Sequence, residues 1–349
     1  MSAATEDSPA EAGFAPDLAE KLDHGIRSGL LRSLHAVLVS RHGRLVLEHY
    51  GEGEDEAWGR PLGRMAFGPD ALHDLRSVTK SVVGLLYGIA LDRGLVPALD
   101  TPLLVGFPEY RDLAADPARA RLTVRTALTM TMGLEWDEER PYTDPANSEI
   151  AMEQAPDRYR FALEQPIIAE PGSRWIYSGG AVALLGALIE RGSGRTLPQF
   201  ADEALLAPLG IRRFEWAAGA DEVASAASGL RLTAPDMMRI GALVLGGGVY
   251  GDRRIVSQSW IEQSATPAVA TGDGLDYGLL WFLGRAPAPA FPQPLSWIGG
   301  FGNGGQRLWV CREAGLCLGI FAGAYNAPDA WVTPMRVWRE IVLANTVRA

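Results

Sequence analysis

The chain has 349 residues, of which 47% are hydrophobic and 21% are charged, a composition typical of a globular protein with one large domain or two ordinary ones. Its formal net charge of −10 argues against nucleic acid and anionic membrane surfaces as partners. No apolar run is long enough to span a bilayer, and the acidic N-terminus lacks the basic and apolar segments of a signal peptide, so we expect a cytoplasmic protein.

The predicted elements begin with a helix and a β-hairpin. They cover residues 15–28 for the helix, and 34–40 and 44–50 for the two strands. Both strand segments are apolar and β-branched, and the His42-Gly43 pair between them is a tight-turn signal. A polar, glycine-containing connection follows the hairpin.

The middle of the chain is predicted to be helical. Residues 77–93 are apolar on nearly every side, which predicts a buried helix with Ser77 in its first turn. Residues 97–221 are mostly helical with long loops, and 180–191 form a second apolar helix that Gly192 closes.

The last third of the chain returns to strands. Thr233 is placed to cap a helix that begins at Ala234 or Pro235. Beyond this helix we predict three strands, 277–283, 306–312 and 316–323. A last helix is predicted over about 329–346.

This order predicts a mixed α/β (α+β) fold. A mostly antiparallel sheet is built from both chain ends and flanked by helices, with a helical domain inserted between them. We expect residues 1–96 and 222–349 to form the α/β domain, 97–221 to form the helical domain, and the active site to lie between the two.

The cysteines and histidines restrict the chemistry. Cys311 and Cys317 are the only cysteines, too few for a disulfide framework, and we interpret them as buried free thiols in a reducing compartment. All five histidines lie in the first quarter of the chain, without an H-E-x-x-H or C-x-x-C pattern. We therefore expect no metal and no cofactor. The lack of a G-x-S-x-G motif argues against an α/β-hydrolase.

One lysine is unusual in its context. The chain has 32 lysines and arginines, but only Lys21 and Lys80 are lysines. Arginine stays protonated at physiological pH, whereas a desolvated lysine can give up its proton and act as a base. Lys80 follows Ser77 by three residues, a spacing that puts both side chains on one helix face. A serine needs an adjacent base to become a nucleophile, and without a distal histidine that base would be Lys80 or a tyrosine.

Two further segments add to this pair. Tyr177 lies in 171-PGSRWIYSGG-180, just before the second apolar helix, where a neighbouring ammonium would lower its pKa from the ordinary value near 10. The segment 299-GGFGNGG-305 has five glycines in seven residues and opens into a strand. Glycines at such a place let a ligand approach the backbone closely, as in an oxyanion hole.

These three motifs in this order resemble the S-x-x-K serine hydrolases, the superfamily of penicillin-binding proteins and class C β-lactamases. Within it, the chain is most similar to the β-lactamase-like carboxylesterases and the 6-aminohexanoate-dimer hydrolases. The resemblance covers about residues 30–345 and includes 123-TVRTALTMTMGL-134 and 205-LLAPLGI-211.

The resemblance implies a role for each motif. Ser77 is the acyl-accepting nucleophile and Lys80 is its proton partner. Tyr177 takes the place of the family's Y-x-N tyrosine, which acts as base and then as acid toward the leaving group. Whether lysine or tyrosine takes the first proton stays open. The backbone N–H groups of Ser77 and Asn303 would form the oxyanion hole.

Two departures from the family pattern bear on the substrate. Gly179 replaces the Asn of Y-x-N, and Gly300 replaces the Lys of K-T-G, so an amide and a cation that bind peptide-like, carboxylate-bearing substrates are missing. Both losses weaken a β-lactamase or D,D-peptidase assignment. We expect the substrate to meet Gly179, Gly300, Phe301, Gly302, Trp136, Tyr142 and Trp297, with Trp281 as a further aromatic candidate.

The resulting hypothesis is a serine hydrolase of the carboxylesterase or amidase type, acting on a small-molecule ester or amide through an acyl-serine. The alternatives are an acyltransferase, a β-lactamase or D-aminopeptidase on the same scaffold, and a non-catalytic binding protein with this fold. The intact set of Ser77, Lys80 and Tyr177 argues against the last.

Overall fold

The computed structural model describes residues 9–347 and is organised around one eight-stranded antiparallel sheet. The acidic segment before residue 9 lies outside the described residues. In sheet order the strands are β10 (Val269–Ala270), β11 (Asp276–Tyr277), β12 (Phe282–Ala286), β13 (Leu295–Gly302), β14 (Gln306–Cys311), β15 (Leu316–Ala322), β1 (Leu34–Arg41) and β2 (Arg44–Tyr50). Strand β15 pairs with β1, for instance Ile320 with Val37, so the two ends of the chain share one sheet as predicted.

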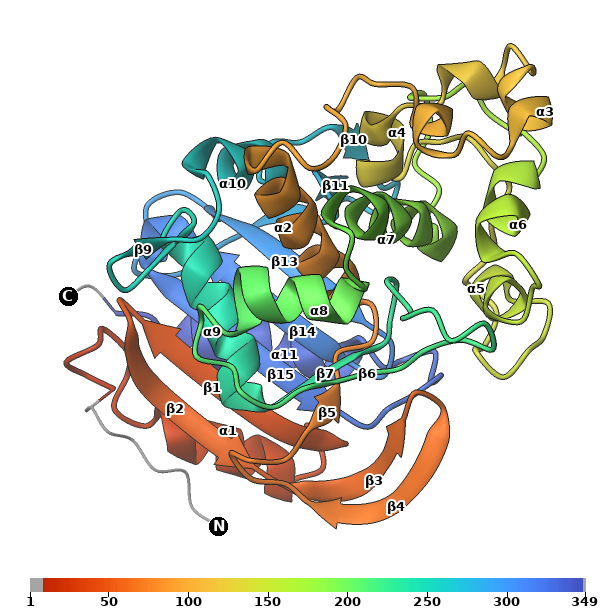
Figure 1. Cartoon of the computed structure of the whole chain (residues 1–349). Helices are drawn as coiled ribbons and strands as arrows, with labels where there is room; N and C mark the ends of the chain where they lie inside the picture. Colours follow the sequence, from red (N-terminus) through yellow and green to blue (C-terminus); the bar gives the residue numbers. More distant parts are fainter. Residues whose placement is uncertain (1–8, 348–349) are drawn as a thin grey trace.

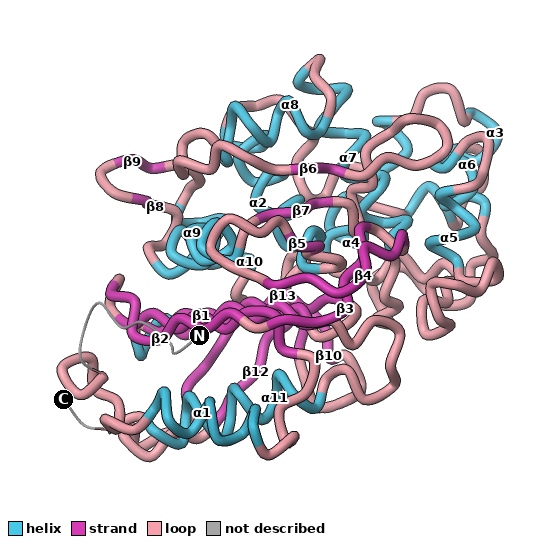
Figure 2. The backbone as a smooth tube through the Cα atoms, turned by 90° about the horizontal axis from the view of Figure 1, so that it is seen from below, coloured by secondary structure: helices cyan, strands magenta, loops and turns pink. Residues whose placement is uncertain are grey.

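Helices cover both faces of this sheet (Figures 1 and 2). Against one face lie α1 (Leu18–Arg27) and the C-terminal helix, which begins with α11 (Val332–Arg336) and continues as a π-helical turn over Val337–Val342 and a 3₁₀ turn over Leu343–Asn345. Against the other face lie α2 (Val78–Asp92) and α9 (Ala234–Leu245). Each face has its own apolar core, and together they establish the mixed α/β architecture.

A helical region lies beside the α2 face of the sheet (Figure 1). It contains α3 (Arg111–Ala114), α4 (Val124–Leu128), α5 (Ser148–Glu153), α6 (Arg158–Glu164), α7 (Gly179–Ser193) and α8 (Leu197–Ala201), with 3₁₀ turns at Leu103–Gly106 and Arg119–Arg121 and a π turn at Asp202–Leu206. Among the described residues, 97–214 contain no strand, only isolated bridges. This distribution supports our proposal of a separate helical domain over 97–221, except that Glu215–Trp216 near its end pair with a strand of the α/β part.

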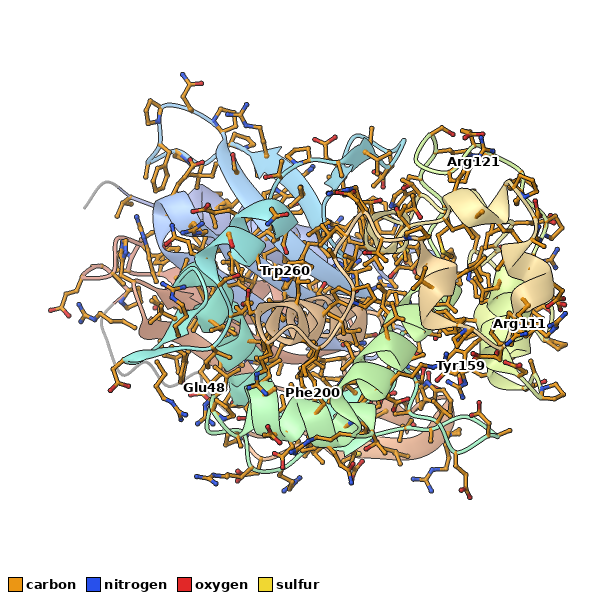
Figure 3. All side chains as sticks on the ribbon, turned by 45° about the horizontal axis from the view of Figure 1, so that its top comes forward. Glu48, Arg111, Arg121, Tyr159, Phe200 and Trp260 are labelled. Carbon is orange, nitrogen blue, oxygen red and sulfur yellow. The ribbon has the colours of Figure 1, made fainter. Side chains whose placement is uncertain are left out.

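The smaller elements complete the α/β part. They are β3 (Glu52–Ala57) paired with β4 (Arg60–Ala66), β5 (His73–Asp74) and β6 (Glu215–Trp216) on either side of β7 (Leu230–Leu232), β8 (Val249–Tyr250) paired with β9 (Arg253–Arg254), and α10 (Gln258–Ser264). Trp260 of α10 is buried and donates from Nε1 to the carbonyl oxygen of Gly84 in α2 at 3.0 Å. Side chains fill this interior region, whereas Arg111 and Arg121 lie at the outer edge of the helical region (Figure 3).

Most predicted elements are confirmed. Ser77 is the N-cap residue of α2, and the Thr233 side chain caps α9 by accepting from Asp236 N at 3.2 Å. Cys311 and Cys317 are buried free thiols. No helix in the described part of the chain is long and apolar enough to cross a membrane.

Three predictions about elements were wrong. The segment 277–283 is not one strand, because Leu280 has a φ of +61° and separates β11 from β12. The second apolar helix does not end at Gly192 but continues to Ser193, with Gly194 as its left-handed C-cap. The polar connection after β2 is the β3–β4 hairpin.

Candidate active site

Ser77 lies where α2 begins, directly after a strained residue. Arg76 has a φ of +48°, in the left-handed region that non-glycine residues seldom adopt. Arg76 is held by ion pairs to Asp74 at 3.2 Å and to Glu56 at 3.3 Å, which offset the cost of this conformation. The backbone therefore turns sharply into the helix and presents the Ser77 hydroxyl at the wall of a cleft.

Lys80 is one helical turn further on, and its ammonium group is surrounded by oxygen atoms. Its Nζ donates to Ser77 Oγ at 3.0 Å and to the carbonyl oxygen of Ala227 at 3.3 Å. It also lies 3.4 Å from Glu149 Oε2 and 3.5 Å from Glu138 Oε2. The side chain is only 1% exposed, so these contacts replace the water that would otherwise solvate the charge.

The two glutamates are site residues that sequence reasoning missed. Glu138 comes from the loop before α5, and Glu149 from the first turn of α5. Glu138 Oε1 accepts from Trp136 Nε1 at 2.6 Å and from the backbone N–H of Gly179, and its Oε2 accepts from the Tyr142 hydroxyl at 3.1 Å. Glu149 Oε1 accepts from Ser228 Oγ at 2.5 Å. Both carboxylates are thus fixed beside Lys80.

These carboxylates reverse the direction in which burial alone would shift the pKa of Lys80. Burial by itself lowers the pKa of a lysine, but Glu138 and Glu149 outweigh it and hold the pKa of Lys80 well above its ordinary value. Lys80 is consequently an ammonium ion at neutral pH rather than a free base. Burial also raises the pKa of Glu138 to about 7, against the opposing effect of Lys80, so this carboxyl takes up or releases a proton near neutrality.

Tyr177 completes the group and also departs from expectation. Its ring centroid lies 4.8 Å from Lys80 Nζ. Burial raises the pKa of Tyr177, although Lys80 and Ser77 act in the opposite direction. The ammonium thus acts in the predicted direction, but burial outweighs it, and the resting side chain is a phenol.

The glycines of β13 allow this strand to approach α2. A Cβ atom at Gly302 would lie 2.5 Å from the carbonyl oxygen of Leu75, and one at Gly300 would lie 3.0 Å from Ser81 Oγ. Phe301 points to the other face of the strand and stacks on Phe282, with ring centroids 4.6 Å apart. The backbone of β13 therefore packs closely against the start of α2, where Ser77 lies.

Two cavities adjoin the cluster of Ser77, Lys80 and Tyr177. One, of about 390 Å³, is lined by Ser77, Asn303, Tyr142 and Glu149 among others. A wider one, of about 1420 Å³, is lined by Tyr177, Phe301, Trp136, Phe282 and Arg307 among others. Trp281 and Trp297, expected at the substrate pocket, instead belong to the two apolar cores.

The surroundings of Gly179 and the position of Arg307 bear on the two departures from the family pattern. A Cβ atom at Gly179 would lie 2.9 Å from both Glu138 Oε1 and Glu149 Oε2, so carboxylates occupy the space next to this position. Arg307 of β14 reaches across to the neighbouring strand β13, where it donates to the carbonyl oxygen of Gly302 at 3.0 Å and lies 4.7 Å from the Phe301 ring centroid. Burial lowers the pKa of Arg307 to about 10.

Comparison with known proteins finds enzymes among the relatives of this chain. Esterase EstB of Burkholderia gladioli is 33% identical over 224 residues, which are 61% of this chain and 55% of EstB. The 6-aminohexanoate-dimer hydrolase of Paenarthrobacter ureafaciens is 24% identical over 321 residues, which are 84% of this chain and 72% of that protein. The match to EstB thus spans about half of that esterase's length.

A solved structure agrees over nearly the whole chain. EstCE1, described as a hydrolase with promiscuous acyltransferase activity, superposes with a TM-score of 0.72 at 17% identity and covers 95% of this chain and 98% of its own. At this identity the likeness shows the fold. The family model described as Beta-lactamase matches residues 25–334, and the chain therefore belongs to the Beta-lactamase family, as its three motifs predicted.

Proposed function

We propose that the chain is a serine hydrolase that cleaves esters or small unactivated amides through an acyl-serine intermediate. The observation that carries this proposal is the Ser77 hydroxyl, 3.0 Å from the Lys80 ammonium at the wall of a cleft. Nucleophile and proton partner are within hydrogen-bond reach, which is the geometry that covalent catalysis requires. The esterase and amide-hydrolase names of its relatives agree with this reaction class.

In the acylation step, Ser77 Oγ bonds to the substrate carbonyl carbon and loses its proton. Protonated Lys80 accepts that proton only after passing one of its own to a carboxylate. Glu149 and Glu138 lie 3.4 and 3.5 Å from Nζ, so this transfer crosses a single short contact. Alternatively the proton moves directly to Tyr177 in the fraction of molecules in which that side chain is ionised, because the resting phenol has no site for a second proton. In either route the carboxylates hold the Lys80 side chain beside Ser77 while the alkoxide develops.

The rest of the cycle follows from the same groups. The carbonyl oxygen becomes an oxyanion, which the backbone N–H groups of Ser77 and Asn303 would stabilise, since both residues line the same cleft. The phenol of Tyr177 then gives its proton to the departing alkoxide or amine. Water attacks the acyl-enzyme and gives a proton to the Tyr177 phenolate, the bond to Ser77 Oγ breaks, and the serine regains a proton from Lys80 or from Tyr177.

An acyltransferase is the second candidate. It shares every step up to the acyl-enzyme and differs only in that an alcohol replaces water in deacylation. The wide cavity beside Tyr177, about 1420 Å³, offers room for such an acceptor. Product analysis with a short alcohol added to an ester assay distinguishes transfer from hydrolysis.

The first prediction concerns the nucleophile. Ser77→Ala should abolish ester hydrolysis and covalent labelling by a fluorophosphonate, while the circular dichroism spectrum stays unchanged. Ser81→Ala, one turn further along α2, serves as the matched control and should keep both. Turnover by Ser77→Ala above about 1% of the parent would place the catalytic serine elsewhere.

The second prediction concerns the lysine. Lys80→Arg keeps the charge, but the planar guanidinium transfers no proton and is too large for the space beside Ser77. We expect kcat to fall by about 10³-fold or more, the scale of losing one member of a nucleophile–base pair. Lys21→Arg, a change at the only other lysine, should have no effect. Near-parental activity in Lys80→Arg would reduce Lys80 to an electrostatic role and leave Tyr177 as the base.

The third prediction concerns pH. Because burial raises the pKa of Glu138 to about 7, this carboxyl is protonated below neutrality and accepts a proton from Lys80 only above it. The kcat/KM for an ester should therefore rise with pH through an apparent pKa near 7. Glu138→Gln should remove this rise and lower activity by about 10²-fold, the usual scale of an acid–base contribution.

Glu153→Gln is the control for this pH profile. Burial raises the pKa of Glu153 to about 7 as well, but its carboxylate pairs with Arg158 at 2.9 Å and not with Lys80. In the Glu153→Gln variant, kcat/KM should still rise with pH as in the parent protein. An unchanged profile in Glu138→Gln would exclude Glu138 from the proton path.

The fourth prediction concerns substrate class. A charge-assisted hydrogen bond to a substrate carboxylate contributes about 1.5–3 kcal/mol, or about 10–150-fold in kcat/KM. Gly300 supplies no such cation, and carboxylates replace the amide at Gly179. We expect kcat/KM for a p-nitrophenyl butyrate ester to exceed that for a chromogenic cephalosporin by at least about 10²-fold. Efficient cephalosporin turnover would make β-lactamase the better assignment.

A further inference from the structure

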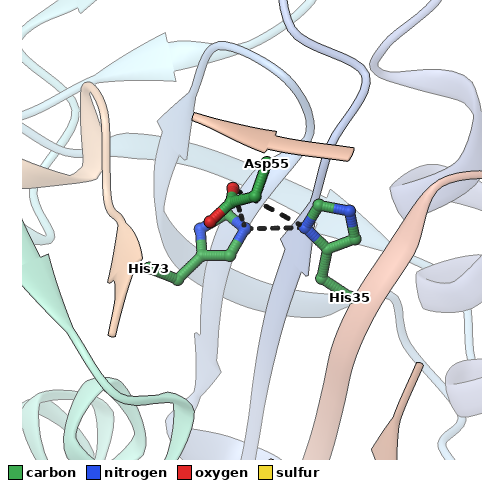
Figure 4. Close-up of side chains that lie close together, drawn as sticks. All are labelled: His35, Asp55 and His73. Carbon is green, nitrogen blue, oxygen red and sulfur yellow. Dashed lines mark hydrogen bonds and ion pairs between the residues drawn. The ribbon is translucent and has the colours of Figure 1, made fainter. Parts of the chain in front are cut away.

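A second cluster of ionisable side chains lies outside the proposed active site. His35 comes from β1, Asp55 from β3 and His73 from β5, and Tyr325 follows β15. His35, His73 and Asp55 are 1–3% exposed, and their polar atoms face one another (Figure 4). The proposed mechanism uses none of these groups.

The polar atoms of the cluster are spaced like the ligands of one ion. His35 Nδ1 lies 2.8 Å from His73 Nε2 and 4.0 Å from Asp55 Oδ1, and these last two atoms are 3.4 Å apart. The Tyr325 hydroxyl lies 2.8 Å from Asp55 Oδ1 and 3.4 Å from His73 Nε2. Four ligands about 2.1 Å from a tetrahedral ion are separated by about 3.4 Å, within the observed range.

The histidine rings are held in orientation by their surroundings. His73 Nδ1 donates to the carbonyl oxygen of Asp74 at 3.0 Å, which leaves the Nε2 lone pair facing the cluster. The ring of Phe321 stacks on His73 at 4.4 Å, and that of Phe67 stacks on His35 at 4.0 Å.

Asp55 supplies the independent reason for a cation. Within the described part of the chain, the carboxylate has ion-pair contacts with His35 and His73 only, and none with a lysine or arginine. The Tyr325 hydroxyl donates to Oδ1, while the buried Oδ2 has no hydrogen-bond partner among the described residues. A buried carboxylate is costly unless it is paired or coordinates a metal.

We propose that His35 Nδ1, His73 Nε2 and Asp55 Oδ1 bind one Zn²⁺ ion, with the Tyr325 hydroxyl oxygen as the fourth ligand. Two imidazole nitrogens and a carboxylate oxygen are ligands that Zn²⁺ accepts, and a fourth protein ligand closes the site. For His35 to bind through Nδ1, its ring proton must reside on Nε2. A closed, buried site of this kind is structural and does not activate water.

The site would join elements that otherwise meet through few contacts. It would tie the β3–β4 hairpin and β5 to β1 of the main sheet. The chain continues from His73 through Asp74 and Arg76 to Ser77, and the Arg76 guanidinium lies 4.8 Å from the Tyr325 ring centroid. The ion would thus hold the segment in which Arg76 keeps its strained conformation.

The test is the metal content of the full chain, produced without a histidine tag. The protein is unfolded in denaturant with a chelator, then refolded with either excess ZnCl₂ or chelator, and free metal is removed. We expect about one zinc per chain after refolding with ZnCl₂. The Tm of the protein refolded with chelator should be about 5 °C or more below the Tm of the protein refolded with ZnCl₂. Refolding with Co²⁺ should give the visible absorption bands of a tetrahedral site.

Variants assign the metal to the cluster. Asp55→Asn and His73→Ala should lose the zinc and the cobalt bands, and Tyr325→Phe should keep the fold but bind more weakly. His49→Ala, a change at a second buried histidine outside the cluster, is the matched control and should bind one zinc. If the parent protein holds less than about 0.1 zinc after refolding with ZnCl₂, the cluster is a hydrogen-bonded network and the proposal is wrong. Equal loss of zinc in His49→Ala would also overturn it.

Discussion

The active-site arrangement depends on one buried ammonium group. Lys80 is almost inaccessible to water, and isolating its charge there would cost several kcal/mol. Glu138 and Glu149 compensate that cost. Glu138 is fixed by further donors from the helical region, and Glu149 by the Ser228 hydroxyl just before β7. The ion-pair cluster therefore joins α2 to α5 and to the loop before it. Removing Lys80 or both glutamates would leave buried, unpaired charge, so the geometry around Ser77 and the contact between α2 and the helical region depend on the same interaction.

A second constraint is the close passage of β13 along the start of α2. Gly300 and Gly302 leave no side chain on the face of the strand that meets the helix, and any Cβ there would press on Ser81 or on the backbone of Leu75. The strand consequently packs its backbone against the start of α2. Phe301, on the other face, extends an aromatic stack toward Phe282. The alternation of small and large side chains thus gives the strand one face that meets the helix closely and one aromatic face.

The sequence predicted the parts of the site that depend on local geometry. A helix fixes the Ser77–Lys80 spacing, and a glycine-rich strand marks a close approach, so both are readable from short segments. Glu138 and Glu149 were missed because they lie 58 and 69 positions beyond Lys80, in a segment whose polar sequence carries no pattern that points to Lys80. The high pKa of Lys80 could not be predicted for the same reason, since burial alone would have lowered it. In the fold, Leu280 broke a predicted strand through a positive φ that its residue type disfavours.

The environment of Lys80 also answers why this arginine-rich chain keeps a lysine there. The ammonium nitrogen contacts four oxygen atoms, those of Ser77, Ala227, Glu149 and Glu138, at 3.0 to 3.5 Å. A compact ammonium on a flexible stem meets acceptors distributed around it, whereas a guanidinium presents its donors in one plane. The requirement is therefore geometric as well as chemical. Even if Tyr177 takes the serine proton, an arginine would not keep both carboxylates and the nucleophile around a single nitrogen.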